Sequence, residues 1–263
     1  MRIITDPCGR MLSVADHPHK IISLVPSQTE LLYALGLSDE VCGITRFCIH
    51  PGAWHQSKTR IGGTKNPSLS LIRSLEPDLI LANKEENRKE DISELEKDFP
   101  VWVSDCNDLR SALDMINEVG MLVNKQQEAQ LLTAAIESSF SSIPLLKKRP
   151  RTAYLIWKDP WMSAGGDTFI HAMLEAAGFE NLFRNAKRYP VTSPEELMEM
   201  GCEMVLLSSE PYPFRDKHIL QLQEKMPEVR ISICDGEIFS WYGSRLLLAP
   251  AGFLELRKKL DIC

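Results

Sequence analysis

Cys48 and His50 are the side chains whose types and spacing point most directly to chemistry. They stand two residues apart in Cys48-Ile49-His50, and residues two apart in an extended loop point the same way. Thiolate and imidazole both bind transition metals, so the pair could ligate a metal or the cobalt of a corrinoid. The thiol could also act as a nucleophile if a base and an orienting group lay beside it. A third interpretation, a buried cysteine beside a surface histidine, carries no function.

Aromatic and charged residues gather in the segments that directly follow the predicted strands. Ligands of open parallel sheets bind beyond the carboxyl ends of the strands. Tryptophan and tyrosine give broad apolar contact with a polar tip, which suits a large amphipathic ligand, although a single tryptophan is usually core. The candidate ligand contacts from these segments are Phe47, Cys48, His50, Asn83, Lys84, Trp157, Trp161, Tyr212, Trp241, Tyr242 and Arg245.

A glycine-rich turn lies between two predicted elements of the first half. Gly62-Gly63-Thr64-Lys65 lacks the full pattern of a nucleotide-phosphate loop. Its backbone N–H groups and Lys65 could still hold an anion. Lys65 is therefore a further candidate ligand contact.

Alternating strands and helices must position these residues. Ser27 and Glu30 are spaced as a capping box at the start of one helix, which Gly36 closes. Short apolar runs predict buried strands, and spacings of three and four predict helices. The predicted strands are Ile21–Val25, Val41–Thr45, Leu79–Ala82 and Val101–Val103, and Leu69, Ile72 and Leu75 form a helical stripe. This alternation predicts an α/β fold with helices packed on a parallel sheet.

The second half of the sequence repeats the plan of the first. A helix is predicted over Thr168–Ala177, and another begins with Ser193 as its cap and Pro194 in its first turn. The segments from Ser68 and Ser193 align without a gap, which indicates an internal repeat unless two unrelated helix–strand units align by chance. The predicted strands are Ala153–Ile156, Met204–Leu207 and a last short one near Glu237–Phe239.

A long helix is predicted between the two halves, over Asn124–Leu146. The segment contains no glycine, and its apolar residues recur at spacings of three and four. About 22 helical residues would span roughly 33 Å. The sequence therefore predicts an N-terminal lobe at 1–123, a connecting backbone helix at 124–147 and a C-terminal lobe at 148–263. A rigid helix leaves little room for lobe closure.

Composition excludes several classes of protein. The net charge of −6 gives no electrostatic footprint for nucleic acid. No apolar run approaches the roughly 20 residues of a membrane span. Seven scattered cysteines without a CxxC motif make a poor disulfide framework. With no apolar leader at the N-terminus, the sequence as it stands suits the cytoplasm, whereas a processed exported form would be periplasmic.

The segments IISLVPSQTELLYALG, SLIRSLEPDLILA and FSWYGSRLLLAP, with the long central helix, resemble the helical-backbone metal-receptor superfamily. These are the substrate-binding proteins of ABC transporters for vitamin B12, haem and ferric siderophores, also called class III periplasmic binding proteins. The resemblance covers about residues 3 to 260 and is closest to the cobalamin-binding branch. It implies two Rossmann-like lobes joined by one rigid helix, a ligand held in the cleft between them, and no catalysis.

The resemblance implies ligand contacts residue by residue. The family's aromatic contacts fall on Phe47, on Trp157 and on Tyr189. Two other aromatic positions of the cobalamin branch fall near Thr64 and Asn83 and are absent here. With Lys65 and Lys84 beside them, this side is more polar and cationic, which puts intact cobalamin in doubt and admits an acidic or phosphate-bearing ligand.

The resemblance also implies a partner. Family members present an acidic residue at a helix start in each lobe, which meets arginines on the permease. Glu195 matches in the C-terminal lobe, whereas the N-terminal position falls on Ser70.

We therefore predict a substrate-binding protein for a cobalamin-like corrinoid, a haem or an iron chelate, serving ABC-type transport and holding no intrinsic cofactor. Two alternatives stay open. One is an intracellular carrier of a related anionic ligand, and the other is a small thiol- or metal-dependent enzyme that uses Cys48 and His50.

Overall fold

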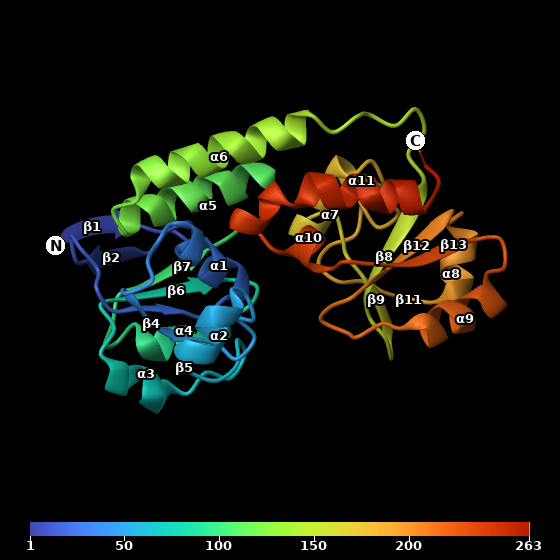
Figure 1. The fold of residues 1–263 in the computed structure, drawn as a ribbon. Coiled ribbons are helices and arrows are strands. Elements are labelled where there is room, and N and C mark those ends of the chain that lie inside the picture. The colour runs from blue at the N-terminus through green and yellow to red at the C-terminus, as the bar shows by residue number, and fades with distance from the viewer. Residues whose placement is uncertain (263) are drawn as a thin grey trace. The chain divides into compact units, whose positions relative to one another are not determined.

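The computed structural model describes residues 1–262, and Cys263 lies outside the described residues. The chain divides into two units. Unit 1 comprises Met1–Cys106, Arg110–Ala135 and Tyr242–Arg245, and unit 2 comprises Asn107–Leu109, Ile136–Trp241 and the chain from Leu246 onward. Each unit contains its own mainly parallel sheet with helices (Figure 1), so the predicted α/β class is confirmed.

Unit 1 is built on a five-stranded parallel sheet with the strand order β5-β4-β3-β6-β7. The runs of buried aliphatic residues form strands where the pattern predicted them. The strands are β3 (Ile21–Ser23), β4 (Val41–Ile44), β5 (Thr59–Arg60), β6 (Leu79–Asn83) and β7 (Val101–Ser104), and an antiparallel hairpin of β1 (Arg2–Thr5) and β2 (Met11–Val14) precedes them. The helices are α1 (Pro26–Ala34), α2 (Gly52–Ser57), α3 (Leu69–Leu75), α4 (Lys89–Leu95) and α5 (Leu109–Leu122).

The start of helix α1 differs from the prediction. The N-cap is Val25, Pro26 stands in the first turn, and no side chain caps the helix, so the predicted capping box of Ser27 and Glu30 is wrong. Proline has no N–H to satisfy and its fixed φ suits a first helical position, so the helix begins there. Thr29 Oγ1 donates to the Val25 carbonyl at 3.0 Å.

Helix α6 (Gln126–Ser141) is shorter than the predicted central helix. Its 16 residues span about 24 Å. Pro144 disfavours the helical conformation at the residue before it, so the chain leaves the helix at Ser141. The limit between the two units falls inside α6, after Ala135. Within unit 1, a Cβ atom at Gly120 would lie only 2.4 Å from Ala129 Cβ, so glycine lets α5 and α6 approach closely.

Unit 2 is built on a six-stranded sheet with the strand order β11-β9-β8-β12-β13 and β10 beside β8. The strands are β8 (Arg151–Trp157), β9 (Trp161–Ser163), β10 (Glu180–Asn181), β11 (Val191–Thr192), β12 (Met204–Ser208) and β13 (Arg230–Cys234). Strand β9 is antiparallel to β8 and β11, and the other pairs are parallel. The helices are α7 (Phe169–Ala176), α8 (Pro194–Glu199), α9 (Asp216–Lys225), α10 (Glu237–Ser240) and α11 (Ala249–Lys259), with a 3₁₀ turn η1 (Ser244–Leu247).

Two predicted helix starts in unit 2 are confirmed. Thr168 Oγ1 accepts a hydrogen bond from the His171 N–H, and Ser193 Oγ accepts one from the Glu196 N–H. Each side chain satisfies a backbone donor that has no partner within its helix.

The last predicted strand is wrong. Glu237–Phe239 lies in helix α10, because the Asp235 carboxylate accepts from the Glu237 N–H at 3.0 Å and turns the chain. The strand lies earlier, at β13. Arg230 and Ser232 alternate with Ile231 and Ile233, so β13 lacks the continuous apolar run by which the other strands were predicted.

Candidate ligand-binding surfaces

An aromatic cluster lies in unit 2 where β8 ends and β12 gives way to a loop. The Trp157 and Tyr212 rings meet edge to face at 5.5 Å, and Trp161 stacks on Phe214 with the planes 2° apart. Tyr212 and Phe214 lie 4.7 Å apart and complete the cluster. Trp157 is 42% exposed. The structure thus brings three predicted residues together around Phe214.

Phe214 and His218 extend this cluster but are absent from the predicted set. His218 is buried and packs against both Phe214 and Tyr212, with ring centroids 5.4 and 5.5 Å away. Burial lowers the pKa of His218, and its Nδ1 accepts from the Arg215 N–H. Phe214 ends the same post-strand segment as Tyr212, which is the signal that could have identified it.

Tyr189 lies apart from Trp157 within unit 2. Met162 of β9 pairs with Trp157 of β8 on one side and with Val191 of β11 on the other. Tyr189 stands two residues before Val191. The guanidinium of Arg188 lies over the Tyr189 ring at 5.8 Å. Strand β9 therefore separates the two aromatic residues.

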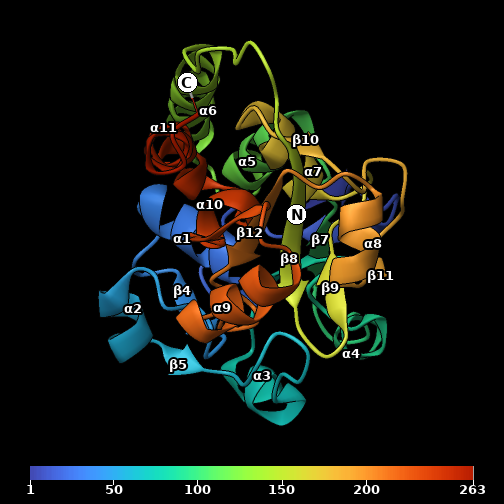
Figure 2. The ribbon, with the colours of Figure 1, turned by 90° about the vertical axis from the view of Figure 1, so that its right-hand side faces the viewer.

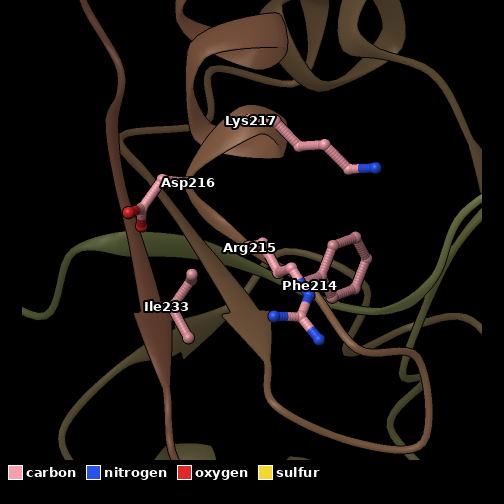
Figure 3. Close-up of a pocket in the computed structure, with 5 residues that line it drawn as sticks. All are labelled: Phe214, Arg215, Asp216, Lys217 and Ile233. Carbon is pink, nitrogen blue, oxygen red and sulfur yellow. The ribbon is translucent and has the colours of Figure 1, made fainter.

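A hollow of about 490 Å³ lies next to the aromatic cluster (Figure 3). Its lining comes from the segment that starts helix α9 and from strand β13. Pockets for small molecules commonly measure about 300–1,000 Å³. The lining residues are Phe214, Arg215, Asp216, Lys217 and Ile233.

Trp241 is buried within unit 2. Its Nε1 donates to Glu210 Oε1 at 2.8 Å, and Ser240 Oγ donates to the same oxygen at 2.8 Å. Burial raises the pKa of Glu210, and both hydrogen bonds oppose that shift. These contacts give Trp241 a structural role in holding the loop after β12.

Tyr242 and Arg245 pack into unit 1. The Tyr242 hydroxyl donates to Glu86 Oε1 at 2.9 Å. Arg245 forms a two-pronged ion pair with Glu30 of α1, at 2.9 and 2.8 Å. The side chains are 11% and 19% exposed, so these guanidinium donors serve a largely buried carboxylate.

The thiol of Cys48 is buried in unit 1. Thr29 Oγ1 lies 3.0 Å from Cys48 Sγ, and Thr45 Oγ1 lies 3.1 Å from the same sulfur. Burial raises the pKa of Cys48, so the thiol is protonated at neutral pH. His50 is half-buried. A protonated, enclosed thiol is neither an activated nucleophile nor a ready metal ligand.

No group of three or more His, Cys, Asp or Glu residues within 1–262 is arranged to hold a metal ion. Over the same range, no helix is long and apolar enough to cross a membrane. A metal-ligand role for Cys48 and His50 stays a prediction.

The loop after β4 presents a half-exposed aromatic ring. Phe47 is 49% exposed, and the Arg46 guanidinium lies 5.0 Å from its ring centroid. The glycine-rich turn packs against this pair, because a Cβ atom at Gly63 would lie 3.2 Å from Phe47. Arg46 is missing from the predicted set, although it stands in the same post-strand segment.

The other polar candidates of unit 1 are held by neighbours. Lys84 forms an ion pair with Asp105 at 2.5 Å, which raises the pKa of Lys84. Asn83 is buried and donates to Ser104. Lys65 Nζ donates to a backbone carbonyl, that of Glu85, at 2.5 Å. Of the two predicted lysines, Lys84 is therefore neutralised by a carboxylate, whereas Lys65 donates to a backbone carbonyl.

The two predicted docking positions lie on short helices. Glu195 is in the first turn of α8 and pairs with Lys225 at 3.1 Å, and its backbone hydrogen bond contributes most to lowering its pKa. Ser70 lies in α3 and is exposed, with its hydroxyl 3.4 Å from that of Ser68. Glu195 is thus the one ionised side chain of the two.

Known proteins resemble this chain in sequence. The Periplasmic binding protein family matches residues 21–227. The uncharacterized ABC transporter substrate-binding lipoprotein YvrC of Bacillus subtilis (strain 168) is 26% identical over 217 residues, which cover 77% of this chain and 68% of that protein. A vitamin B12-binding protein of Vibrio vulnificus (strain YJ016) is 25% identical over 188 residues, which cover 68% of this chain and 67% of that protein.

A solved structure shares the fold. The periplasmic heme-binding protein RhuT from Roseiflexus sp. RS-1, in its apo form, matches with a TM-score of 0.77 at 20% identity. The match covers 90% of this chain and 98% of that chain. These matches confirm the resemblance to substrate-binding proteins of ABC transporters. Since the family match spans most of the sequence, this chain belongs to the Periplasmic binding protein family.

Proposed function

We propose that this chain is the substrate-binding component of an ABC-type transport system and that its ligand is a large metal chelate of the corrinoid, haem or ferric-siderophore class. The observation that carries the proposal is the aromatic cluster of unit 2, with Trp157 half-exposed beside Tyr212. Family membership supports the same class, as do the vitamin B12-binding and heme-binding proteins among its relatives.

The cluster suits such a ligand physically. Trp157 and Tyr212 brace each other edge to face, so little side-chain freedom is lost when a ring system settles on them. Phe47 offers a second half-exposed ring, in unit 1. Aromatic faces contribute broad dispersion contact and few directional demands, which matches a macrocycle or a catechol-rich chelate.

A permease is the partner that this function requires. Glu195 is ionised and exposed in the first turn of α8, where it can meet a cationic side chain. Ser70 offers no charge at the corresponding position of α3. We propose that docking relies on Glu195 more heavily than on α3.

The function is tested by titrating the protein with aquocobalamin, haemin and a ferric siderophore while following absorbance. One chelate should bind, and Trp157→Ala should weaken its binding by about 2–4 kcal/mol, as expected for a central aromatic contact. Tyr33→Ala is the matched control, because Tyr33 is an equally exposed ring (47%) on helix α1 that packs on Trp54. Equal effects of the two variants, or no binding of any chelate, would sink the proposal.

A further inference from the structure

A long stretch of unit 1 carries no acidic residue. From Val41 to Leu75 the sequence contains five lysines and arginines, two histidines and no aspartate or glutamate. The whole chain has 36 acidic residues and 30 lysines and arginines, so the positive charge of this segment is opposite in sign to the net charge of the chain. It comprises β4, α2, β5 and α3, which lie together at the β5 edge of the sheet (Figure 1, Figure 2).

Most lysines and arginines of this segment have no carboxylate partner among the described residues. Arg73 is neutralised by Glu94 and Asp98. Lys58 and Lys65 instead donate to the backbone carbonyls of Ser38 and Glu85. The Arg46 guanidinium contacts the Phe47 ring and forms no ion pair within residues 1–262. An exposed guanidinium without a carboxylate keeps its donors available for a ligand.

Arg46 stands where ligands of this kind of sheet bind. It stands two residues after Ile44, where β4 ends, and its N–H donates to the Gly62 carbonyl at 2.8 Å, which extends the β4–β5 pairing beyond the strand ends. A Cβ atom at Gly63 would lie 2.4 Å from Asn66 Oδ1 and 3.5 Å from Arg46 Nε. The turn therefore packs directly against the Arg46 and Phe47 side chains.

We propose that Arg46 pairs with a carboxylate of the ligand, while Phe47 lies against its ring system. The inference rests on the proposed function and narrows its ligand to an acidic chelate, one with carboxylates at its edge. A planar guanidinium presents two parallel N–H donors to a carboxylate, which a lysine ammonium does not. A chelate whose edge carries neutral carboxamides gains nothing from this contact.

The test compares haemin, which carries two carboxylates, with its dimethyl ester. Wild-type protein should bind haemin at least about tenfold more tightly than the ester, as expected for one charge-assisted, hydrogen-bonded pair. Arg46→Gln should weaken haemin binding to the level of the ester and leave ester binding unchanged. Arg46→Lys should restore part of the difference. Circular dichroism of each variant checks that it folds.

Lys58→Gln is the matched control. It removes the same charge from the same acid-free segment, but Lys58 precedes β5, at the opposite end of β4 from Arg46. Equal losses for Arg46→Gln and Lys58→Gln would overturn the inference, because general charge would then explain both. Equal binding of haemin and its ester by wild-type protein would also overturn it.

Failure of the proposed function gives a different result. If wild-type protein binds neither haemin nor its ester, a calorimetric titration with citrate tests separately whether Arg46 pairs with a carboxylate. Citrate binding that Arg46→Gln abolishes and Lys58→Gln preserves supports it, and the absence of such binding overturns it. Equal losses of both variants on anionic phospholipid vesicles, without citrate binding, would assign the segment to a lipid surface instead.

Discussion

At the scale of single residues, side-chain partners decide which sequence candidates can face a ligand. Arg245 and Tyr242 follow an aromatic motif and are predicted as contacts, yet carboxylates of unit 1 hold both. Spacing along the chain shows which residues follow a strand. Spacing does not show which distant carboxylate will pair with such a residue, because Glu30 stands 215 residues before Arg245.

Arg245→Ala should lower the free energy of unfolding by about 2–4 kcal/mol, because it leaves the Glu30 carboxylate largely buried and unpaired. Urea unfolding measures this change. Lys125→Ala is the control, since its pair with Glu128 is exposed and should contribute less than about 0.5 kcal/mol. A variant of Arg245 that keeps its stability but loses chelate binding would return this residue to the ligand surface.

Cys48 is a second case in which spacing along the chain does not predict the partners of a side chain. An i, i+2 spacing places Cys48 and His50 on one side of an extended loop, but the structure turns the thiol inward to Thr29 and Thr45. The two threonine hydroxyls lie 3.0 and 3.1 Å from the sulfur, although the residues stand 19 and 3 positions before Cys48 in sequence. Burial of this kind is a property of packing and is invisible to a local motif.

At the scale of elements, apolar periodicity predicts the fully buried strands well and the partly exposed ones poorly. Strands β3, β6, β8 and β12 are buried runs that lie where the pattern places them. Strands β5 and β13 carry polar and exposed residues and lack a continuous apolar run, whereas the edge strand β7 is buried throughout and was predicted. The apolar pattern therefore predicts a strand correctly where both faces of the strand are buried.

The repeat of Ser68 and Ser193 leads to a prediction about helix caps. Ser193→Ala should lower the free energy of unfolding by about 1 kcal/mol, because Ser193 Oγ accepts from the Glu196 N–H at 3.1 Å. Ser68→Ala should change it by less than about 0.5 kcal/mol, because Ser68 makes no side-chain cap of helix α3. Chemical denaturation of both variants provides the measurement, and equal losses would show that the two starts are equivalent after all.

At the scale of the whole molecule, the sequence identifies the family and the fold, and the candidate site is only partly foreseen. The family and the fold can be identified from the motifs around β3 and before β6 and from the alternation of strands and helices. Of the predicted contacts, Trp157, Trp161 and Tyr212 come together, while Trp241, Tyr242, Asn83 and Lys84 are held by neighbours. Arg46 and Phe214 stand in the same post-strand segments as predicted residues, and the contacts of each with a neighbouring ring single them out.

The central claim, that this chain binds a metal chelate, is tested most directly by retention of colour. The purified protein is mixed separately with aquocobalamin, haemin and a ferric siderophore, then desalted, and its absorbance spectrum is recorded. At least one chromophore should stay with the protein near one-to-one stoichiometry, and haemin should be favoured over aquocobalamin. Loss of all three colours on desalting would contradict the claim.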